Sequence, residues 1–400
     1  MFFTKNKIDR NLAYFLTNSQ LKKFRVLIYC KNFKDAIIKK VNSYRGTLLY
    51  NLKYSNLICA IVDRKSIQYL VEYPEVSYIT FDEYLFLCGG MSISSANSCF
   101  FSKNNIHELS GKDVSIGLID SGVYPHEDLI SPSNRILEFT DLINNYKYPY
   151  DDNGHGTCCA GIICGSGISS NNIYSGIAKH SNLLTYKCFD KLGKGYASTV
   201  LFAIETLIDN SLENKLKILS LPFELLNYNS IIIEAFDKTF KKDISKNITP
   251  IVPAGSNIND QETIRGIAYL KSCITVGGLD TSKGRMPYIY SSSGFNCKNT
   301  KPDLCAACVN ITSLNSNTSY ISEKNGIKLY PKKLEKKHTT FSGTSLAVAF
   351  VSGICALLYE KNPHYSFDDI KSLLKLNCTD EGFDAPNQGE GTIDISSILK

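Results

Sequence analysis

Short, continuous apolar runs recur through the last three quarters of this chain and alternate with stretches in which apolar residues have helical spacing. The clearest runs are Val114–Ile119, Lys217–Leu221, Ile248–Gly255 and Cys273–Leu279, and the clearest helical stretch is Ala197–Asn210. A strand that is apolar along its whole length, rather than at alternate residues, is typical of a parallel sheet covered on both faces. The pattern therefore predicts an α/β fold over residues 91–400, with a parallel sheet that carries helices on both faces.

The first 90 residues have a different order of elements. Strand-like runs lie at Phe24–Cys30, Gly46–Leu52, Asn56–Asp63 and Val76–Leu87, and helical stretches lie at Phe33–Tyr44 and Arg64–Pro74. The order strand, helix, strand, strand, helix, strand is that of the split ferredoxin-like motif. Gly89-Gly90 and the small polar residues after them indicate a boundary. We expect a small α+β ferredoxin-like domain over residues 1–90 and a larger α/β domain over residues 91–400.

The composition excludes several classes of protein. The 44 basic residues exceed the 38 acidic ones by six, a mild excess for 400 residues and unlike the concentrated basic stripe of a nucleic-acid-binding protein. The N-terminus lacks the basic and then apolar segments of a secretory signal, and no apolar run approaches the roughly 20 residues of a membrane span. We therefore expect a cytoplasmic protein with no nucleic-acid partner and no membrane span.

Fourteen cysteines are compatible with that compartment if they are reduced and mostly buried as small apolar side chains. Cys305 and Cys308 form a CxxC pair, but no second pair follows at zinc-site spacing, so we predict no metal site. A polar stretch rich in lysine, asparagine and serine, about Ser313 to Lys337, indicates an inserted surface loop.

Three polar residues that are far apart in the sequence carry the candidate chemistry. Asp120 follows the run Val114–Ile119, and the carboxyl end of a parallel strand is where open α/β sheets build their sites. His155 lies between two glycines at the start of a helical stretch. Ser345 begins a long apolar helical stretch, so the free N–H groups of a helix N-terminus lie beside it. Taken singly, these residues are as easily a turn aspartate, a structural histidine and an N-cap serine.

Together the three residues form a set that can activate a nucleophile. An aspartate orients an imidazole, the imidazole takes the proton of a serine hydroxyl, and the serine oxygen attacks a carbonyl carbon. The order Asp, His, Ser along the chain is that of subtilisin and differs from the orders in the other triad folds. The string around Ser345 lacks the second glycine of the GxSxG elbow, which argues against an esterase on an α/β sheet.

Three sequence blocks extend this argument to a known family. DSGV at Asp120, NGHGTCCAG from Asn153 and SGTSLAVAFVSG from Ser342 resemble the signature blocks of the subtilisin-like (S8) serine proteases. The resemblance covers about residues 90–400 and implies a subtilisin-like fold and a serine endopeptidase whose catalytic residues are Asp120, His155 and Ser345. It leaves structural calcium open, because no Asp-rich ligand loop stands out, and it implies no other cofactor.

The resemblance also assigns a role to the N-terminal domain. That domain resembles the family's propeptide, an intramolecular chaperone and inhibitor that is removed from the mature enzyme. We expect the chain to be a zymogen that is cut near Leu87–Ser92, about thirty residues before Asp120.

The candidate binding residues follow from the weaker blocks. Ser256 stands where the family has the asparagine that stabilises the oxyanion, and Asn257 follows it, so either side chain could be the donor. We expect an extended protein or peptide substrate to pair with strand edges near Lys217–Leu221 and Ile251–Ala254. The predicted substrate-binding residues, which are as readily core residues, are Ser220, Leu221, Pro222 and Ala254.

The altered oxyanion block leaves a second function open, a weak or inactive pseudoprotease that acts as a regulator or scaffold. Within active proteases, the roles that fit are intracellular turnover, removal of a leader peptide, and cleavage of a zymogen in a sporulating cell or spore.

Overall fold

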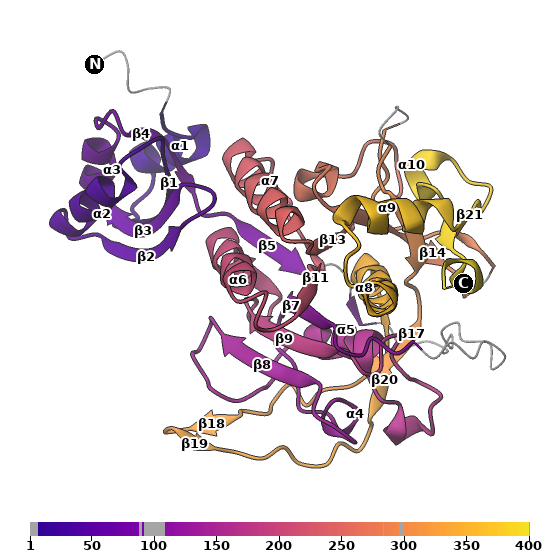
Figure 1. The fold of residues 1–400 in the computed structure, drawn as a ribbon. Coiled ribbons are helices and arrows are strands. Elements are labelled where there is room, and N and C mark those ends of the chain that lie inside the picture. The colour runs from indigo at the N-terminus through magenta and orange to yellow at the C-terminus, as the bar shows by residue number, and fades with distance from the viewer. Residues whose placement is uncertain (1–6, 88–89, 92–108, 283, 296–299, 400) are drawn as a thin grey trace. The chain divides into compact units, whose positions relative to one another are not determined.

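The computed structural model describes residues 7–87, 90–91, 109–282, 284–295 and 300–399. It divides into two compact units, coloured from indigo at the N-terminus to yellow at the C-terminus in Figure 1. The first unit comprises Met1–Tyr84, Tyr196–Thr206 and Asn229–Thr239, and the second comprises Leu85–Gly195, Leu207–Tyr228 and Phe240–Lys400. The first unit thus takes in two segments from beyond residue 90, where the sequence predicts the domain boundary.

The first unit contains a four-stranded antiparallel sheet in the order β2-β3-β1-β4. Its strands are β1 (Lys23–Cys30), β2 (Thr47–Leu52), β3 (Leu57–Asp63) and β4 (Val76–Phe81). Helix α2 (Lys34–Ser43) connects β1 to β2, and α3 (Arg64–Leu70) connects β3 to β4. These elements follow the predicted ferredoxin-like order. Helix α1 (Arg10–Asn18), which the sequence analysis does not anticipate, precedes them and buries Leu12 and Leu16 in the core of this unit.

The second unit is built on a mostly parallel sheet. Its parallel strands, in spatial order, are β8 (Ile136–Asp141), β9 (Asn182–Lys187), β7 (Ser115–Asp120), β11 (Leu216–Ser220), β13 (Thr249–Pro253), β14 (Ile274–Asp280), β16 (Leu304–Ala307) and β22 (Thr392–Ile393). Two short strands, β15 (Met286–Pro287) and β21 (Cys378–Thr379), are antiparallel additions. The predicted α/β fold with a parallel sheet is confirmed.

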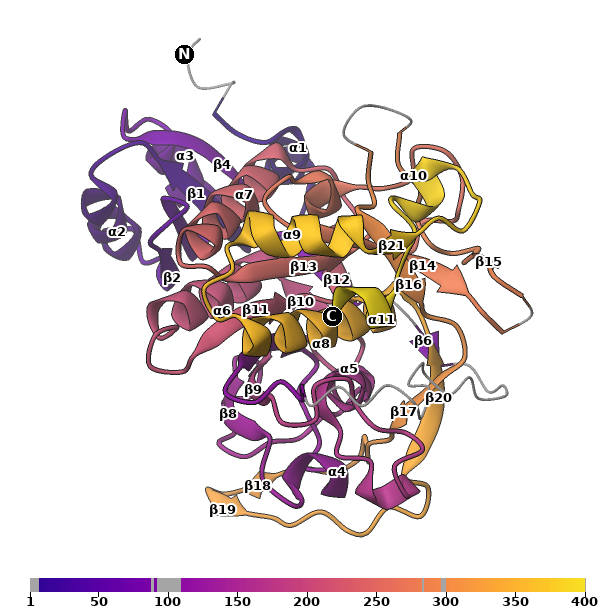
Figure 2. The ribbon, with the colours of Figure 1, turned by 45° about the vertical axis from the view of Figure 1, so that its right-hand side comes forward.

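Helices cover the sheet because its apolar strands have two faces to bury. Helix α8 (Thr344–Lys361) packs against β7, β11, β13, β14 and β16, and α5 (His155–Cys164) packs against α8 and β7. Figure 2 shows α8 and α9 (Phe367–Leu376) in front of the strands. On the opposite face, Leu207 in the last turn of α6 (Ala197–Asp209) lies against Gly117 of β7. A Cβ on Gly117 would lie 2.9 Å from Cδ1 of Leu207.

Helix α8 differs from the other helices in its length and composition. Among the described residues it is the one helix long and apolar enough to cross a membrane, and nearly all of it is buried inside the second unit. Its apolar side chains pack against the sheet and against α5, as those of a core helix do.

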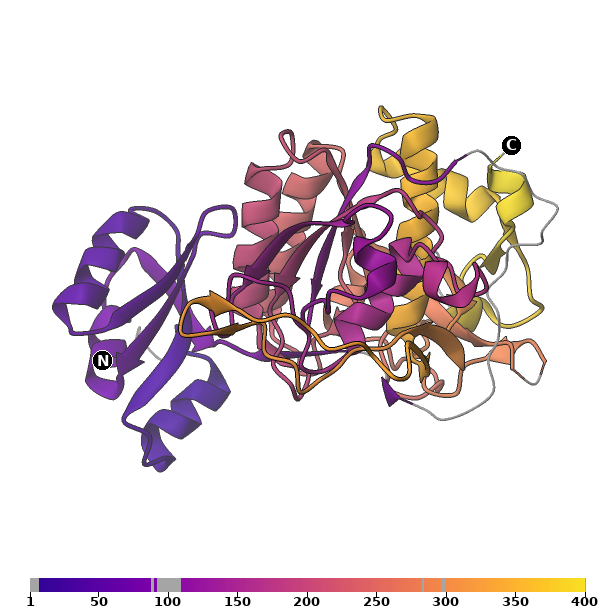
Figure 3. The same ribbon diagram turned by 90° about the horizontal axis from the view of Figure 1, so that it is seen from below.

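The predicted surface loop at Ser313–Lys337 begins inside β17 (Ile311–Leu314), so the connection to β20 (His338–Ser342), which pairs antiparallel with β17, is residues 315–337. Figure 3 shows it in orange as a long arm ending in the hairpin of β18 (Glu323–Lys324) and β19 (Ile327–Lys328). The arm is more ordered than a plain surface loop. Tyr320 is buried edge-on against Tyr124, and the Tyr124 hydroxyl donates to the Lys332 carbonyl at 3.1 Å.

The described cysteines behave as predicted from the composition. All eleven of them are free, and ten are buried. Burial raises the pKa of several of these thiols, including Cys164 to about 12, so they pack as neutral apolar groups.

One buried acid gives a test of the fold. Asp243, in helix α7 (Ser230–Ser245), is fully buried, and neither of its carboxylate oxygens has a hydrogen-bond partner. Burial raises the pKa of Asp243 well above its ordinary value, and Lys246 opposes this to a smaller extent. Since the folded state holds the proton more tightly than the unfolded state, stability falls as the pH rises above the unfolded value of about 4.

We expect Asp243→Asn to raise the free energy of unfolding by about 1–3 kcal/mol at pH 8 and to change it little near pH 4. Urea unfolding of a Ser345→Ala chain, which avoids self-digestion, measures both values. Glu213→Gln, on an exposed residue, is the control. Equal effects at the two pH values would show that ionisation of Asp243 carries no cost.

Candidate active site

A buried aspartate and a histidine meet where β7 ends and α5 begins. The Nδ1 atom of His155 lies 2.9 Å from both carboxylate oxygens of Asp120, which is 1% exposed. The backbone N–H of Ser121 donates to the same carboxylate at 2.6 Å. A carboxylate can only accept, so the proton lies on Nδ1, and Nε2 is left as the basic nitrogen.

The environment of His155 pulls its pKa in two directions. Burial lowers the pKa of the imidazole, but the attraction of Asp120, with a smaller contribution from Cys159, raises it well above its ordinary value. The pair therefore stabilises an imidazolium, which is the charge that a general base acquires.

Glycine allows the close approach of helix α5 to strand β7. A Cβ on Gly156 would lie 2.0 Å from the Gly122 carbonyl oxygen and 3.1 Å from Cβ of Asp120. Any other residue at position 156 would push the histidine away from the aspartate. The glycines that flank His155 in the sequence are therefore part of the site's geometry.

Asp151 organises the loop that carries the histidine, and the sequence analysis missed it. Its buried carboxylate accepts from the N–H of Gly154 at 2.8 Å, the N–H of Thr157 at 2.9 Å and the hydroxyl of Ser121 at 2.8 Å. It thereby joins the turn after Asp120 to the turn before His155. The pair Asp151-Asp152 just before the histidine block was the available signal.

Lys187 is a second group that the sequence analysis missed. It lies beside Asp120 across the β7–β9 pair and is completely buried. Its ammonium group donates to the Ser121 carbonyl at 2.6 Å, to the Phe189 carbonyl at 3.0 Å and to Asp152 at 2.5 Å. A lysine in a strand gives no local sign that it will be buried, so this role depends on the tertiary fold.

Ser345 is the second residue of α8 and is fully buried. The residue before the helix is Gly343, which has no side chain, so the free N–H groups of the helix's first turn have no side-chain cap. The Ser345 hydroxyl donates to the Pro222 carbonyl at 3.3 Å. The structure thus joins Asp120 to His155 and places Ser345 near the start of a helix that packs against α5.

Both candidate oxyanion donors contact one carboxylate. The Ser256 hydroxyl and the Asn257 side-chain amide each donate to Glu224, the latter at 3.0 Å. The loop that carries them is tied to the start of α8 by the hydroxyl of Thr344, which donates to the Gly255 carbonyl at 3.4 Å. The loop of Ser256 and Asn257 is therefore joined to the start of α8, and the sequence analysis missed Glu224.

The predicted substrate-binding residues are all buried: Ser220, Leu221, Pro222 and Ala254. The strand edges predicted with them are wrong. Lys217–Leu221 covers most of β11 and the residue after it, and β11 is paired with both β7 and β13. Ile251–Ala254 covers the end of β13 and the residue after it, and β13 is paired with both β11 and β14. Interior strands have no unpaired backbone groups to offer a peptide.

The strand that does bind an extended segment is β12 (Phe223–Glu224), directly after Pro222. It pairs antiparallel with β5 (Tyr84–Leu87), with Phe223 opposite Leu87 and Glu224 opposite Phe86. A few residues later, β6 (Gly90–Met91) pairs with the end of β20, three residues before Ser345. The chain is thus held on both sides of residues 88–89, which lie outside the described residues.

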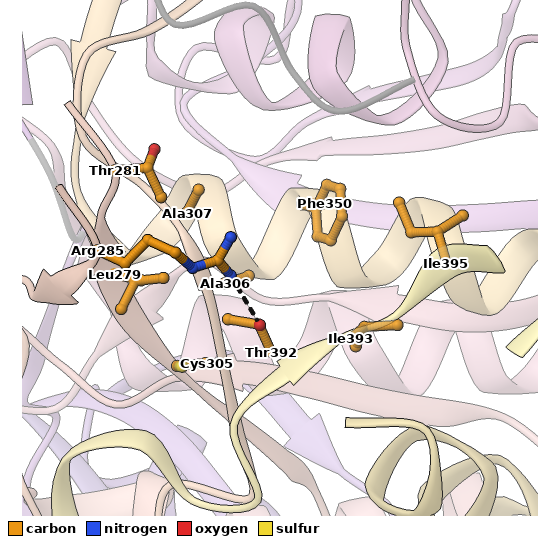
Figure 4. Close-up of a pocket in the computed structure, with 10 residues that line it drawn as sticks. All are labelled: Leu279, Thr281, Arg285, Cys305, Ala306, Ala307, Phe350, Thr392, Ile393 and Ile395. Atoms are coloured by element: carbon orange, nitrogen blue, oxygen red, sulfur yellow. Dashed lines mark hydrogen bonds between the residues drawn. The ribbon is translucent and has the colours of Figure 1, made fainter. Parts of the chain in front are cut away.

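One residue of the CxxC pair adjoins this site, because the Cys308 carbonyl accepts from the N–H of Gly343 at 2.9 Å, two residues before Ser345. Burial raises the pKa of Cys305 to about 12. Cys305 lines a cavity of about 110 Å³ across which Arg285 donates to the hydroxyl of Thr392 at 3.0 Å (Figure 4). Among the described residues, the one group of close potential metal ligands is Asp120, His155 and Cys159, which contains the candidate catalytic pair.

The parallel sheet, the buried Asp120–His155 pair and the serine at the start of the central helix are the features expected of a serine peptidase with a subtilisin-like α/β fold. The model of the subtilase family matches residues 111–392. The chain belongs to the subtilase family, as the three sequence blocks predict.

Named relatives agree with this assignment. The chain is 34% identical over 315 residues to serine protease AprX of Bacillus subtilis (strain 168). The aligned region covers 74% of this chain and 68% of AprX. It is 23% identical over 377 residues to subtilisin E of the same organism, covering 92% of this chain and 86% of the relative. The named relatives are proteases, which supports an active enzyme over a scaffold.

A solved structure shows the same fold. Fervidolysin from Fervidobacterium pennivorans, described as a keratinolytic enzyme related to subtilisin, superimposes with a TM-score of 0.72 at 17% sequence identity. The match covers 96% of this chain and 61% of fervidolysin, so this chain spans less than two thirds of that protein.

The buried lysine provides a test of how the site is supported. We expect Lys187→Met to destabilise the protein by roughly 2–4 kcal/mol, because two carbonyls and the partly buried Asp152 lose their shared donor. Unfolding in urea, again in a Ser345→Ala chain, measures this. Lys191→Met, at an exposed position, should be nearly neutral. A Lys187→Met protein as stable as the control would mean that these acceptors find other donors.

Proposed function

We propose that this protein is an endopeptidase that cleaves proteins or peptides through Asp120, His155 and Ser345 and an acyl-enzyme intermediate. The observation that carries the proposal is the buried contact of Asp120 with His155. Asp120 fixes the tautomer, Nε2 of His155 takes the hydroxyl proton of Ser345, and the serine oxygen attacks the carbonyl carbon of the substrate. The imidazolium then protonates the leaving amine, and water releases the acyl group by the same steps.

The hydroxyl of Ser345 must change partner in this mechanism. In the structure it donates to Pro222, and rotation about the Cα–Cβ bond would turn it toward His155. The developing oxyanion would accept from the backbone N–H of Ser345 and from Ser256 or Asn257. An uncapped helix N-terminus supports this role, since no side-chain cap competes for the N–H groups of its first turn.

The chain's own β5 segment indicates how a substrate would bind. We propose that an extended peptide pairs with β12 as β5 does, so that main-chain hydrogen bonds supply affinity and nearby side chains supply preference. Leu221, Pro222 and Ala254 would line the apolar part of the pocket beside this strand.

The same segment supports self-processing. β5 pairs with the strand that follows Pro222, and β6 pairs with the strand that leads to Ser345, so the chain is held on both sides of residues 88–89. We therefore propose that the enzyme cuts itself within Leu87–Ser92. Part of that window, residues 88, 89 and 92, lies outside the described residues.

The N-terminal domain would then act as an intramolecular inhibitor. Within the first unit, Asp82 accepts from the N–H of Ser198 at 2.9 Å and from Arg25 at 2.6 Å, at the start of α6. Glu205, one helix turn before the end of α6, accepts from the N–H groups of Lys53 and Tyr54 at 2.8 and 3.1 Å. Such contacts with a helix beyond the cleavage window would keep a cut domain bound.

The compartment is also a proposal. The free, mostly buried cysteines of the described residues are typical of a reducing environment, which favours the cytoplasm, including that of a sporulating cell. Intracellular turnover, leader-peptide removal and zymogen cleavage are all compatible with this location.

Labelling with a fluorophosphonate tests the proposal directly. We expect the expressed wild-type chain to be labelled on Ser345 and to show a new N-terminus within Leu87–Ser92 by mass spectrometry. Ser345→Ala should be unlabelled and uncut, because the nucleophile is absent. A folded wild-type chain that is neither labelled nor cut would support the scaffold function.

Removing the charge of Asp120 tests the role of the pair. We expect Asp120→Asn to lower kcat by about 10⁴-fold, because the amide favours the wrong tautomer of His155. It should also lower the pKa of the imidazole, because the attraction of Asp120 is lost, and NMR titration of the histidine signals measures this. Full activity with a normal imidazole pKa would remove Asp120 from the mechanism.

A further inference from the structure

Glu224 is a nearly buried carboxylate that accepts several hydrogen bonds but has no ion-pair partner among the described residues. Its side chain accepts from the N–H of Ser256 at 3.3 Å, from the Ser256 hydroxyl and from the Asn257 amide at 3.0 Å. Glu224 is 8% exposed, and the ion pairs of the described residues do not include it. Buried charges are normally paired with opposite charges, whereas the described partners of this carboxylate are all neutral donors, which leaves its charge available to a positive partner.

The position of this carboxylate is set by two elements of the candidate active site. Glu224 ends strand β12, which pairs with the extended segment β5. Its Oε2 atom lies over Gly255, where a Cβ would come within 2.6 Å of it, and Gly255 has a φ of 109° that favours glycine. Glu224 thus crosses from the peptide-binding strand to the loop at 254–257, two residues after the carbonyl that accepts from Ser345.

We propose that Glu224 recognises a basic side chain, lysine or arginine, of the peptide substrate at the residue whose carbonyl is attacked. This inference rests on the proposed function, because it assigns the preference of that same site for separate substrates. The self-cut proposed within Leu87–Ser92, a window with no lysine or arginine, would depend on the high effective concentration of a segment of the same molecule instead. The methylene groups of a lysine or arginine would pack along Leu221, Pro222 and Ala254, and the charged end would reach Glu224. One long, amphipathic side chain would thus contact both these apolar residues and the nearby acid.

The same contact would affect the chemical step. A carboxylate that holds Ser256 and Asn257 withholds both side-chain donors from the oxyanion, and its own negative charge disfavours the charge that develops on the substrate oxygen. A substrate cation would neutralise Glu224 and compete for its lone pairs, which frees a donor for the oxyanion. A basic substrate should therefore show a higher kcat as well as a lower KM.

Two matched peptide substrates test the proposal. They differ only at the residue before the cleaved bond, which is lysine in one and the uncharged isostere norleucine in the other. We expect the expressed full chain to have about a ten- to hundredfold higher kcat/KM on the lysine peptide, the range of a hydrogen bond to a charged partner. In Glu224→Gln the ratio should fall to about one, because the amide keeps the shape but loses the charge. Glu213→Gln, at an exposed position, should keep the wild-type ratio.

The outcomes separate this inference from the proposed function. A chain that is not labelled by a fluorophosphonate and cuts neither peptide contradicts the endopeptidase itself. A labelled, active chain with no preference for lysine, or with a preference that Glu224→Gln leaves intact, overturns the role of Glu224. If Glu224→Gln accelerates both peptides equally, Glu224 only restrains the oxyanion donors, and the recognition role is wrong. Circular dichroism of Glu224→Gln checks that the variant is folded.

Discussion

The contact between Asp120 and His155 sets the requirements that the surrounding structure meets. It joins a strand in the middle of the sheet to the first residue of a helix, so strand and helix must approach within van der Waals distance. Gly156 has no Cβ to block this approach, and Asp151 accepts hydrogen bonds from both turns. The Lys187 ammonium group donates to the Ser121 carbonyl in the turn after Asp120. These groups are buried, and their polar atoms satisfy one another. The pair is therefore part of the protein interior rather than two flexible side chains on a surface.

Much of the fold could be predicted from the sequence because its signals are local. Strands buried on both faces are apolar throughout, and the catalytic blocks carry their glycines within a few residues of Asp120, His155 and Ser345. The partners of each strand are not local. Lys217–Leu221 looks like any apolar strand, and nothing within it reveals that neighbours on both sides use its backbone groups. The burial of Lys187 and the pairing of β5 with β12 could not be predicted either, because both depend on segments distant in the sequence.

Glu224 and Ser256 together explain a departure that is isolated in the sequence. The family's oxyanion position holds a serine here, and the structure pairs this serine, and the asparagine after it, with a carboxylate from the neighbouring strand. The loop after β13 and the end of β12 therefore act as one unit. The sequence alone presents Ser256 as a weaker donor in an otherwise unchanged site, because Glu224 lies 32 positions away and has no motif of its own.

The placement of β5 and β6 on either side of residues 88–89 has a kinetic consequence. A segment that belongs to the same molecule meets the nucleophile at an effective concentration fixed by the chain, not by how much protein is present. Scission of that segment would be a first-order event, so its half-time would not change on dilution. A cell that makes very few copies would mature them as fast as one that makes many, and one molecule would not need to encounter another.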